Sequence, residues 1–176
     1  MAHYVDNKQF LSVITEHRAK VMEAKEKNLP LPQVPNYLGD CILKIATHLS
    51  YKPNFINYSY REEMISDGIE NCFQYIDNFD PKVSKNPFSY FTQIIYYAFL
   101  RRIQKEKKQL YVKYKATEQI GILDEFEMME FEDGTSNQFT LYDNIAEFIE
   151  TYEEAKEAKK SAKTAKKPKG IEKFIE

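Results

Sequence analysis

The stretch Pro87-Phe-Ser-Tyr-Phe-Thr-Gln-Ile-Ile-Tyr-Tyr-Ala-Phe-Leu-Arg-Arg102 decides the fold, because its apolar residues keep the period of an α-helix. Asn86 stands just before it, and an asparagine followed by proline is typical of a helix start. We therefore expect a long helix that begins near residue 87. One stripe of this helix should face the core, formed by Phe88, Phe91, Ile95 and Phe99.

The residues before this stretch predict three shorter helices with the same period. The first runs from about Lys8 to Lys27 and ends at the prolines of segment 28–35. The third follows Ser59-Tyr-Arg-Glu62, whose spacing predicts a capping box with Ser59 as the cap. The apolar positions of the three helices are Phe10, Leu11, Ile14, Val21 and Met22, then Tyr37, Leu38, Cys41, Ile42, Ile45, Ala46 and Leu49, then Met64, Ile65, Cys72, Phe73 and Ile76.

The sequence as a whole predicts an all-α fold, because it has no long segment that alternates with period two and only five glycines. Beyond Lys115 we expect a compact region 1–116 to give way to an acidic linker and helix, 117–154, and a lysine-rich tether or frayed helix, 155–176. The helix of the acidic part is expected around Tyr142, Ile145, Phe148, Ile149 and Tyr152.

Charge is distributed very unevenly along the chain. The formal net charge is only −2, which by itself argues against a nucleic-acid partner. Between Arg101 and Lys115, however, there are seven Lys or Arg residues and one acid, whereas residues 117–150 contain ten acids and no Lys or Arg. A local basic surface is therefore expected despite the average.

Several functional classes find no support in the sequence. There is no glycine-rich phosphate loop and no serine nucleophile motif, and His3, His17 and His48 lack metal-ligand spacing. Cys41 and Cys72 stand alone at apolar helical positions, which favours reduced thiols in a host cytoplasm. We expect a protein that is not an enzyme, with no metal, cofactor, small-molecule substrate or membrane span.

The face of the long helix opposite its apolar stripe carries aromatic residues first and basic residues after them. Aromatic rings stack on nucleobases, and Lys and Arg neutralise phosphates, so this face suits unpaired DNA. The simpler interpretation is a solvated helix end whose cations complement the helix dipole. The residues of this face are Tyr90, Gln93, Tyr97, Arg101, Lys105 and Lys108.

The segments 63–81 and 87–102 together resemble conserved region 2 of bacterial sigma factors, in both order and spacing. Residues 59–115 are more closely similar to the late-transcription sigma factors of T-even bacteriophages. The resemblance implies a helical domain that binds host RNA polymerase core through a coiled coil of its largest subunit. Matching position by position places that contact on Glu63, Ser66, Asp67, Ile69, Glu70, Phe73 and Gln74.

The same resemblance implies that the next helix recognises a TATA-like box in promoter DNA and traps non-template bases as the duplex opens. The residues that correspond are Tyr90, Gln93, Ile94, Ile95, Tyr97, Arg101 and Arg102. Ile94 and Ile95 stand where many sigma factors carry adjacent tryptophans, and they supply apolar wedges instead. Ile95 also belongs to the predicted core stripe, so its DNA contact is the weaker prediction.

The C-terminal part lacks a basic helix-turn-helix for an upstream promoter element. A sigma factor of this kind needs help, which the resembled phage system obtains from a DNA sliding clamp. An apolar cluster returns at the end of the lysine-rich segment, and the resemblance implies that it binds this clamp. The cluster consists of Ile171, Phe174 and Ile175, and its alternative role is to pack back on the domain.

Two other functional classes remain open at this point. A helical protein that binds single-stranded nucleic acid without polymerase would use the same aromatic and basic face. A protein adaptor would use the acidic segment and the tail, with the basic run merely solvated. The surface from Glu63 to Phe73 separates the first alternative from a sigma factor.

Overall fold

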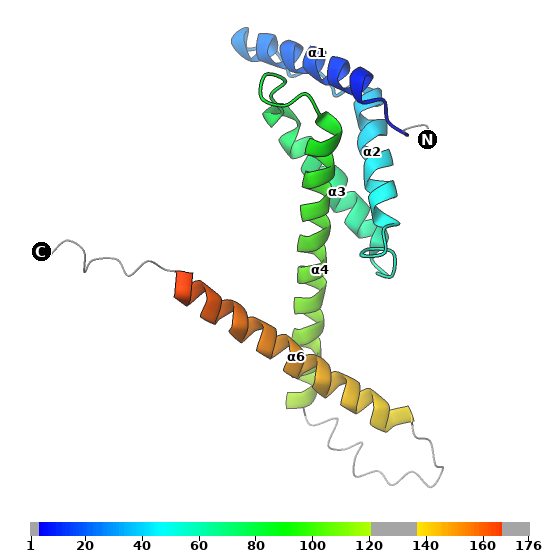
Figure 1. The fold of residues 1–176 in the computed structure, drawn as a ribbon, viewed down its shortest axis with the longest axis vertical. Helices are drawn as coiled ribbons and strands as arrows, with labels where there is room; N and C mark the ends of the chain where they lie inside the picture. Colours follow the sequence, from blue (N-terminus) through cyan, green and yellow to red (C-terminus); the bar gives the residue numbers. More distant parts are fainter. Residues whose placement is uncertain (1–3, 121–136, 167–176) are drawn as a thin grey trace, which may run out of the picture. The chain divides into compact units, whose positions relative to one another are not determined.

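The structure is a computed structural model that describes residues 4–120 and 137–166. Every regular element within these residues is helical, which confirms the all-α prediction. The order along the chain is α1 (Asn7–Glu26), α2 (Asn36–Ser50), α3 (Arg61–Tyr75), the 3₁₀ turn η1 (Ile76–Asn78), α4 (Pro87–Gln119) and α6 (Asn137–Lys166) (Figure 1). In this described part of the chain, no helix combines the length and apolarity needed to cross a membrane.

Two of the helix starts follow the sequence signals closely. Asp6 caps α1, because its Oδ1 accepts hydrogen bonds from the amides of Lys8 and Gln9 at 2.9 and 3.4 Å. Asn86 caps α4 in the same way, accepting from the amide of Ser89 at 3.1 Å, and Pro87 is the first helical residue. The predicted asparagine cap and proline start are confirmed.

The expected capping box at the start of α3 is wrong. The helix begins at Arg61 with Tyr60 as its N-cap, and no side-chain cap bond is found there among the described residues. The Tyr58 and Tyr60 rings pack together with centroids 5.1 Å apart, which turns the chain before the helix. The Glu62 carboxylate lies 3.8 Å from the Arg61 guanidinium instead of reaching back to Ser59.

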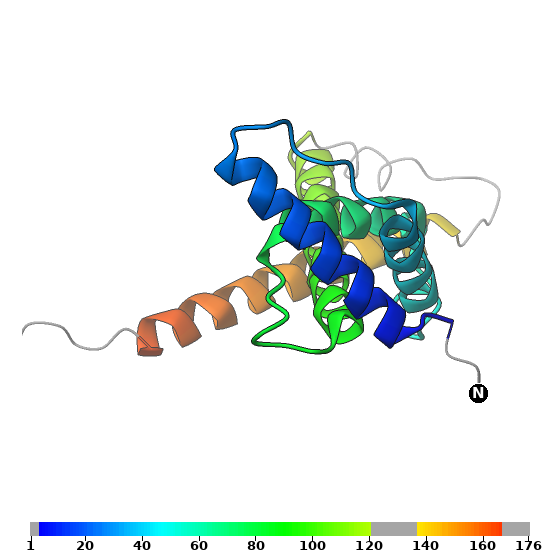
Figure 2. The ribbon, with the colours of Figure 1, turned by 90° about the horizontal axis from the view of Figure 1, so that it is seen from above.

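The chain forms two compact units, Met1–Lys105 and Glu106–Glu176, and α4 contributes residues to both. In the first unit α2 and α3 lie side by side, and α1 crosses over the other helices (Figures 1 and 2). Phe10 of α1 stacks on Phe91 of α4 with centroids 5.4 Å apart, and both rings are fully buried. The core of this unit therefore joins all four helices.

The buried face of α1 differs in one position from the expected one. Its buried residues are Phe10, Ile14, His17, Val21 and Ala24. Met22 is 51% exposed, so its assignment to the core is wrong. The steps of three and four residues place His17 and Ala24 in line with Val21, while Met22 lies about 100° further round the helix.

Gly68 sets how closely α3 approaches α4. A Cβ atom at this position would lie 3.0 Å from Ile95 Cγ2 and 3.1 Å from Phe99 Cε1. Both neighbours are fully buried, so they have little room to move. The absence of a side chain at Gly68 lets the two helices pack backbone against side chain.

The second unit joins the end of α4 to α6 through aromatic contacts. Tyr111 stacks on Tyr152 with centroids 4.4 Å apart, and Tyr114 meets Phe148 edge to face at 5.5 Å. Ile145 and Ile149 of α6 are buried, which confirms the apolar positions expected for a helix in this region. The helix continues through the Ala/Lys segment as far as Lys166.

Candidate nucleic-acid interface on helix α4

The core-facing stripe of α4 determines which of its residues remain at the surface. Phe91, Ile95 and Phe99 are all fully buried, as the sequence predicted. Gln93 is exposed and Ile94 is half-buried, so of the two adjacent isoleucines only Ile94 reaches the surface. Ile95 packs against the position of Gly68 and serves the core.

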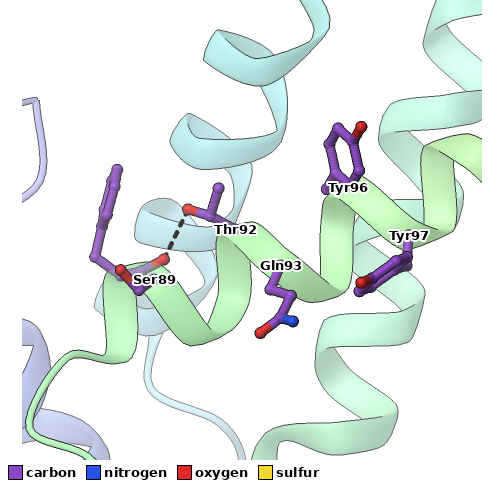
Figure 3. Close-up of a pocket in the computed structure, with 6 residues that line it drawn as sticks. Ser89, Thr92, Gln93, Tyr96 and Tyr97 are labelled. Carbon is purple, nitrogen blue, oxygen red and sulfur yellow. Dashed lines mark hydrogen bonds between the residues drawn. The ribbon is translucent and has the colours of Figure 1, made fainter.

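An open hollow of about 290 Å³ lies on the N-terminal half of α4 (Figure 3). Gln93 and Tyr97 project from one side of the helix there, and Thr92 and Tyr96 from the other. The Thr92 hydroxyl donates to the Phe88 carbonyl oxygen at 2.7 Å, so its methyl group is left to line the hollow. The lining residues are Phe88, Ser89, Thr92, Gln93, Tyr96 and Tyr97.

The two tyrosines of the hollow present aromatic surface to solvent. Tyr96 is 38% and Tyr97 51% exposed, and their rings meet edge to face with centroids 5.9 Å apart. Two rings at different angles beside amide and hydroxyl groups offer stacking and hydrogen bonding to an unpaired base. Phe55 holds Tyr96 from below, with centroids 5.6 Å apart, and is itself buried.

Tyr96 is a residue that the sequence analysis missed. Phe88, Thr92 and Tyr96 are spaced four residues apart, so they share a helix face, but Phe88 was assigned wholly to the core stripe. The structure leaves Phe88 half-buried, packed against the core on one side and lining the hollow on the other. That spacing was the available signal.

Tyr90, expected on the DNA face, is in a different environment from Tyr97. Its hydroxyl donates to the Tyr75 carbonyl oxygen at 3.0 Å, and its ring lies 5.3 Å from that of Phe79. Burial raises the pKa of the Tyr90 hydroxyl above its ordinary value of 10.0. These contacts support the turn after α3, and the DNA contact of Tyr90 stays a prediction.

The two arginines of the basic run are held by α3. Arg102 donates to both carboxylate oxygens of Asp67, from Nε at 2.7 Å and from Nη2 at 2.9 Å. Arg101 Nη2 donates to Asn71 Oδ1 at 2.6 Å. We call Asp67, Asn71, Arg101 and Arg102 the arginine clasp. Lys105 and Lys108, which continue the basic run, are exposed.

The face of α3 expected to bind polymerase is largely open. Glu63, Ser66, Glu70 and Gln74 are exposed, and Ile69 is half-buried against the core. Phe73 is 40% exposed, although a Cβ on Gly39 of α2 would lie 4.0 Å from the edge of its ring. Asp67 differs from the rest of this set, because its carboxylate is already engaged by Arg102.

Other expected sites find less material in the structure. The apolar tail cluster, Ile171, Phe174 and Ile175, lies outside the described residues. Among the residues that are described, no three His, Cys, Asp or Glu side chains gather as a metal site would require. Cys41 and Cys72 are both buried free thiols.

Comparison with known proteins adds no relative: no protein-family model matches the chain, and no curated protein is significantly similar to it.

Proposed function

We propose that this protein is a sigma factor for phage late transcription. In this proposal the exposed face of α3 binds host RNA polymerase core, and α4 recognises and melts a TATA-like box upstream of the start site. The C-terminal tail couples the complex to the DNA sliding clamp. The protein has no catalytic role of its own and acts in the cytoplasm of the host cell.

The observation that carries the proposal is the pairing of two different surfaces on neighbouring helices of one unit. The α3 surface combines carboxylates with an exposed ring, Phe73, which suits a protein partner. The α4 surface combines Tyr96 and Tyr97 with the arginines one turn later, which suits an opened DNA strand. The sequence resemblance to sigma region 2 assigns the same two roles to the same two helices.

Binding to polymerase core is the first test. Changing Glu63 and Glu70 to Lys reverses two exposed charges on α3 and leaves the arginine clasp intact. This double variant should lose core binding in a pull-down while its helical circular dichroism is unchanged. The matched control changes Glu23 and Glu26, two exposed acids of α1, to Lys and should bind as the wild type does.

Promoter opening is the second test, with core-bound protein on an A/T-rich template. Tyr97→Ala removes an exposed ring and should slow opening, since stacking on one base contributes about 1–3 kcal/mol. Tyr97→Phe keeps the ring and should open the promoter at nearly the wild-type rate. If the wild-type chain binds single-stranded DNA but never core, it is a single-strand-binding protein instead.

A further inference from the structure

The arginine clasp joins residues that belong to two different functional surfaces. Asp67 lies on α3, one turn after Glu63 and one turn before Glu70, both of which are exposed. Arg101 and Arg102 lie on α4, one turn beyond Tyr97. All four clasp residues belong to the first compact unit.

The contact between Asp67 and Arg102 has the geometry of a strong ion pair. Two parallel N–H···O bonds at 2.7 and 2.9 Å form the bidentate arrangement that arginine makes with carboxylates. The Arg102 side chain is 17% exposed and that of Asp67 31%, so solvent screens the pair only in part. Asn71, one turn along α3, holds the neighbouring Arg101 at 2.6 Å.

A paired arginine attracts a phosphate less strongly than a free one. The Asp67 carboxylate cancels the charge of Arg102 and occupies the edge of the guanidinium that would otherwise form a fork with phosphate oxygens. An arginine that neutralises no phosphate releases no counterion, and it adds nothing to the salt dependence of binding. The free protein therefore presents less positive charge to DNA than its sequence contains.

We propose that α3 masks the DNA-binding arginines of α4 in the free protein, and that docking of a basic partner on the acidic face of α3 releases them. Asp67 then exchanges Arg102 for a cationic group of the partner, and both arginines become available to DNA phosphates. The release step rests on the proposed function, in which the partner is polymerase core; the masking step does not. Because linkage is reciprocal, DNA bound to the arginines strengthens partner binding by the same factor.

Masking is tested with the full-length protein alone, by titrating a fluorescent single-stranded A/T-rich oligonucleotide over a range of salt concentrations. Asp67→Asn removes the charge and the fork with little change of shape. It should bind several-fold more tightly at low salt, with a slope of log K against log salt steeper by about 0.7 for the one extra phosphate. Asn71→Ala should strengthen binding through Arg101 and serves as the second variant should Asp67→Asn fail to fold.

The matched control is Glu70→Gln, which removes the same charge one turn along α3. The partner of the Glu70 carboxylate is Gln74 on its own helix, at 3.4 Å. Its slope should equal that of the wild type, since only the general field changes. Equal slopes for Asp67→Asn, Glu70→Gln and wild type, or equal steepening in both variants, would overturn the mask.

Release is tested by repeating the titration with saturating polymerase core. Core should raise the DNA affinity of the wild type by a larger factor than that of Asp67→Asn, which has already lost the mask. Equal stimulation of the two proteins would overturn the release step. If core binds neither protein, the proposed function and the release step fail together, while the titrations without core still decide the mask.

Discussion

The change Gly68→Ala tests whether the close approach of α3 and α4 depends on a missing side chain. Alanine in a helix interior is favoured over glycine by about 1 kcal/mol, and this term alone would stabilise the protein. Here the new methyl group would meet Ile95 and Phe99 at 3.0 and 3.1 Å, well inside ordinary van der Waals contact. Overpacking of a well-filled core costs about 1–3 kcal/mol.

The net effect of Gly68→Ala should therefore lie between no change and a destabilisation of about 2 kcal/mol. Gly39→Ala on α2 is the matched control, because its nearest neighbour would be Phe73 Cζ at 4.0 Å, an ordinary contact. That variant should gain up to about 1 kcal/mol from helix propensity alone.

The assay is urea unfolding of both full-length variants, followed by circular dichroism and by tyrosine fluorescence. The difference between the two variants isolates the overpacking cost and should be about 1–3 kcal/mol. If both variants are stabilised equally, the helices are free to separate and Gly68 does not set their distance. The reasoning about the close approach would then be refuted.

Three further predictions use other parts of the chain. Burial raises the pKa of the Cys72 thiol to about 12 and that of Cys41 above its ordinary value, so neither thiol should react with Ellman's reagent at mildly alkaline pH until urea unfolds the protein; reaction of the folded protein would contradict this. The hydrogen bond that Tyr111 donates at 2.7 Å, helped by the Lys115 charge, lowers the pKa of the Glu153 carboxyl below its ordinary value of 4.5. Its stabilisation of the second unit is therefore full above that value and lost as the pH falls through the lowered pKa, and Glu153→Gln should flatten the acid side of the near-ultraviolet circular dichroism profile. Removal of residues 170–176 should abolish clamp-stimulated transcription and spare basal activity with core alone, whereas loss of both would show that the tail is not a clamp contact.

Much of the fold follows from local patterns that the sequence states directly. The spacing of apolar residues identified every described α-helix, and Asn86-Pro87 marked the start of α4. The capping box before α3 failed because its residues satisfy the motif while the Tyr58 and Tyr60 contact directs the chain otherwise. A local motif is decisive only where tertiary packing leaves the backbone free to adopt it.

The candidate site shows where such patterns stop being informative. Helical period places Tyr90 and Tyr97 on one face of α4, yet Tyr90 packs on Phe79 and donates to Tyr75, whereas Tyr97 is half exposed. Period fixes the direction of a side chain around its own helix, but it does not say which other segment lies opposite.

The sequence alone determined the helices, the buried stripe of α4 and the separation of basic from acidic segments, because each depends on residues close together in the chain. Tertiary structure decided that Asp67 meets Arg102 across 35 positions of sequence and that Asn71 meets Arg101 across 30. Those contacts exist because Gly68 lets α3 lie against α4 at that height. Helix packing, which no single-helix pattern contains, thus assigned one residue of the expected polymerase face to the arginines of the expected DNA face.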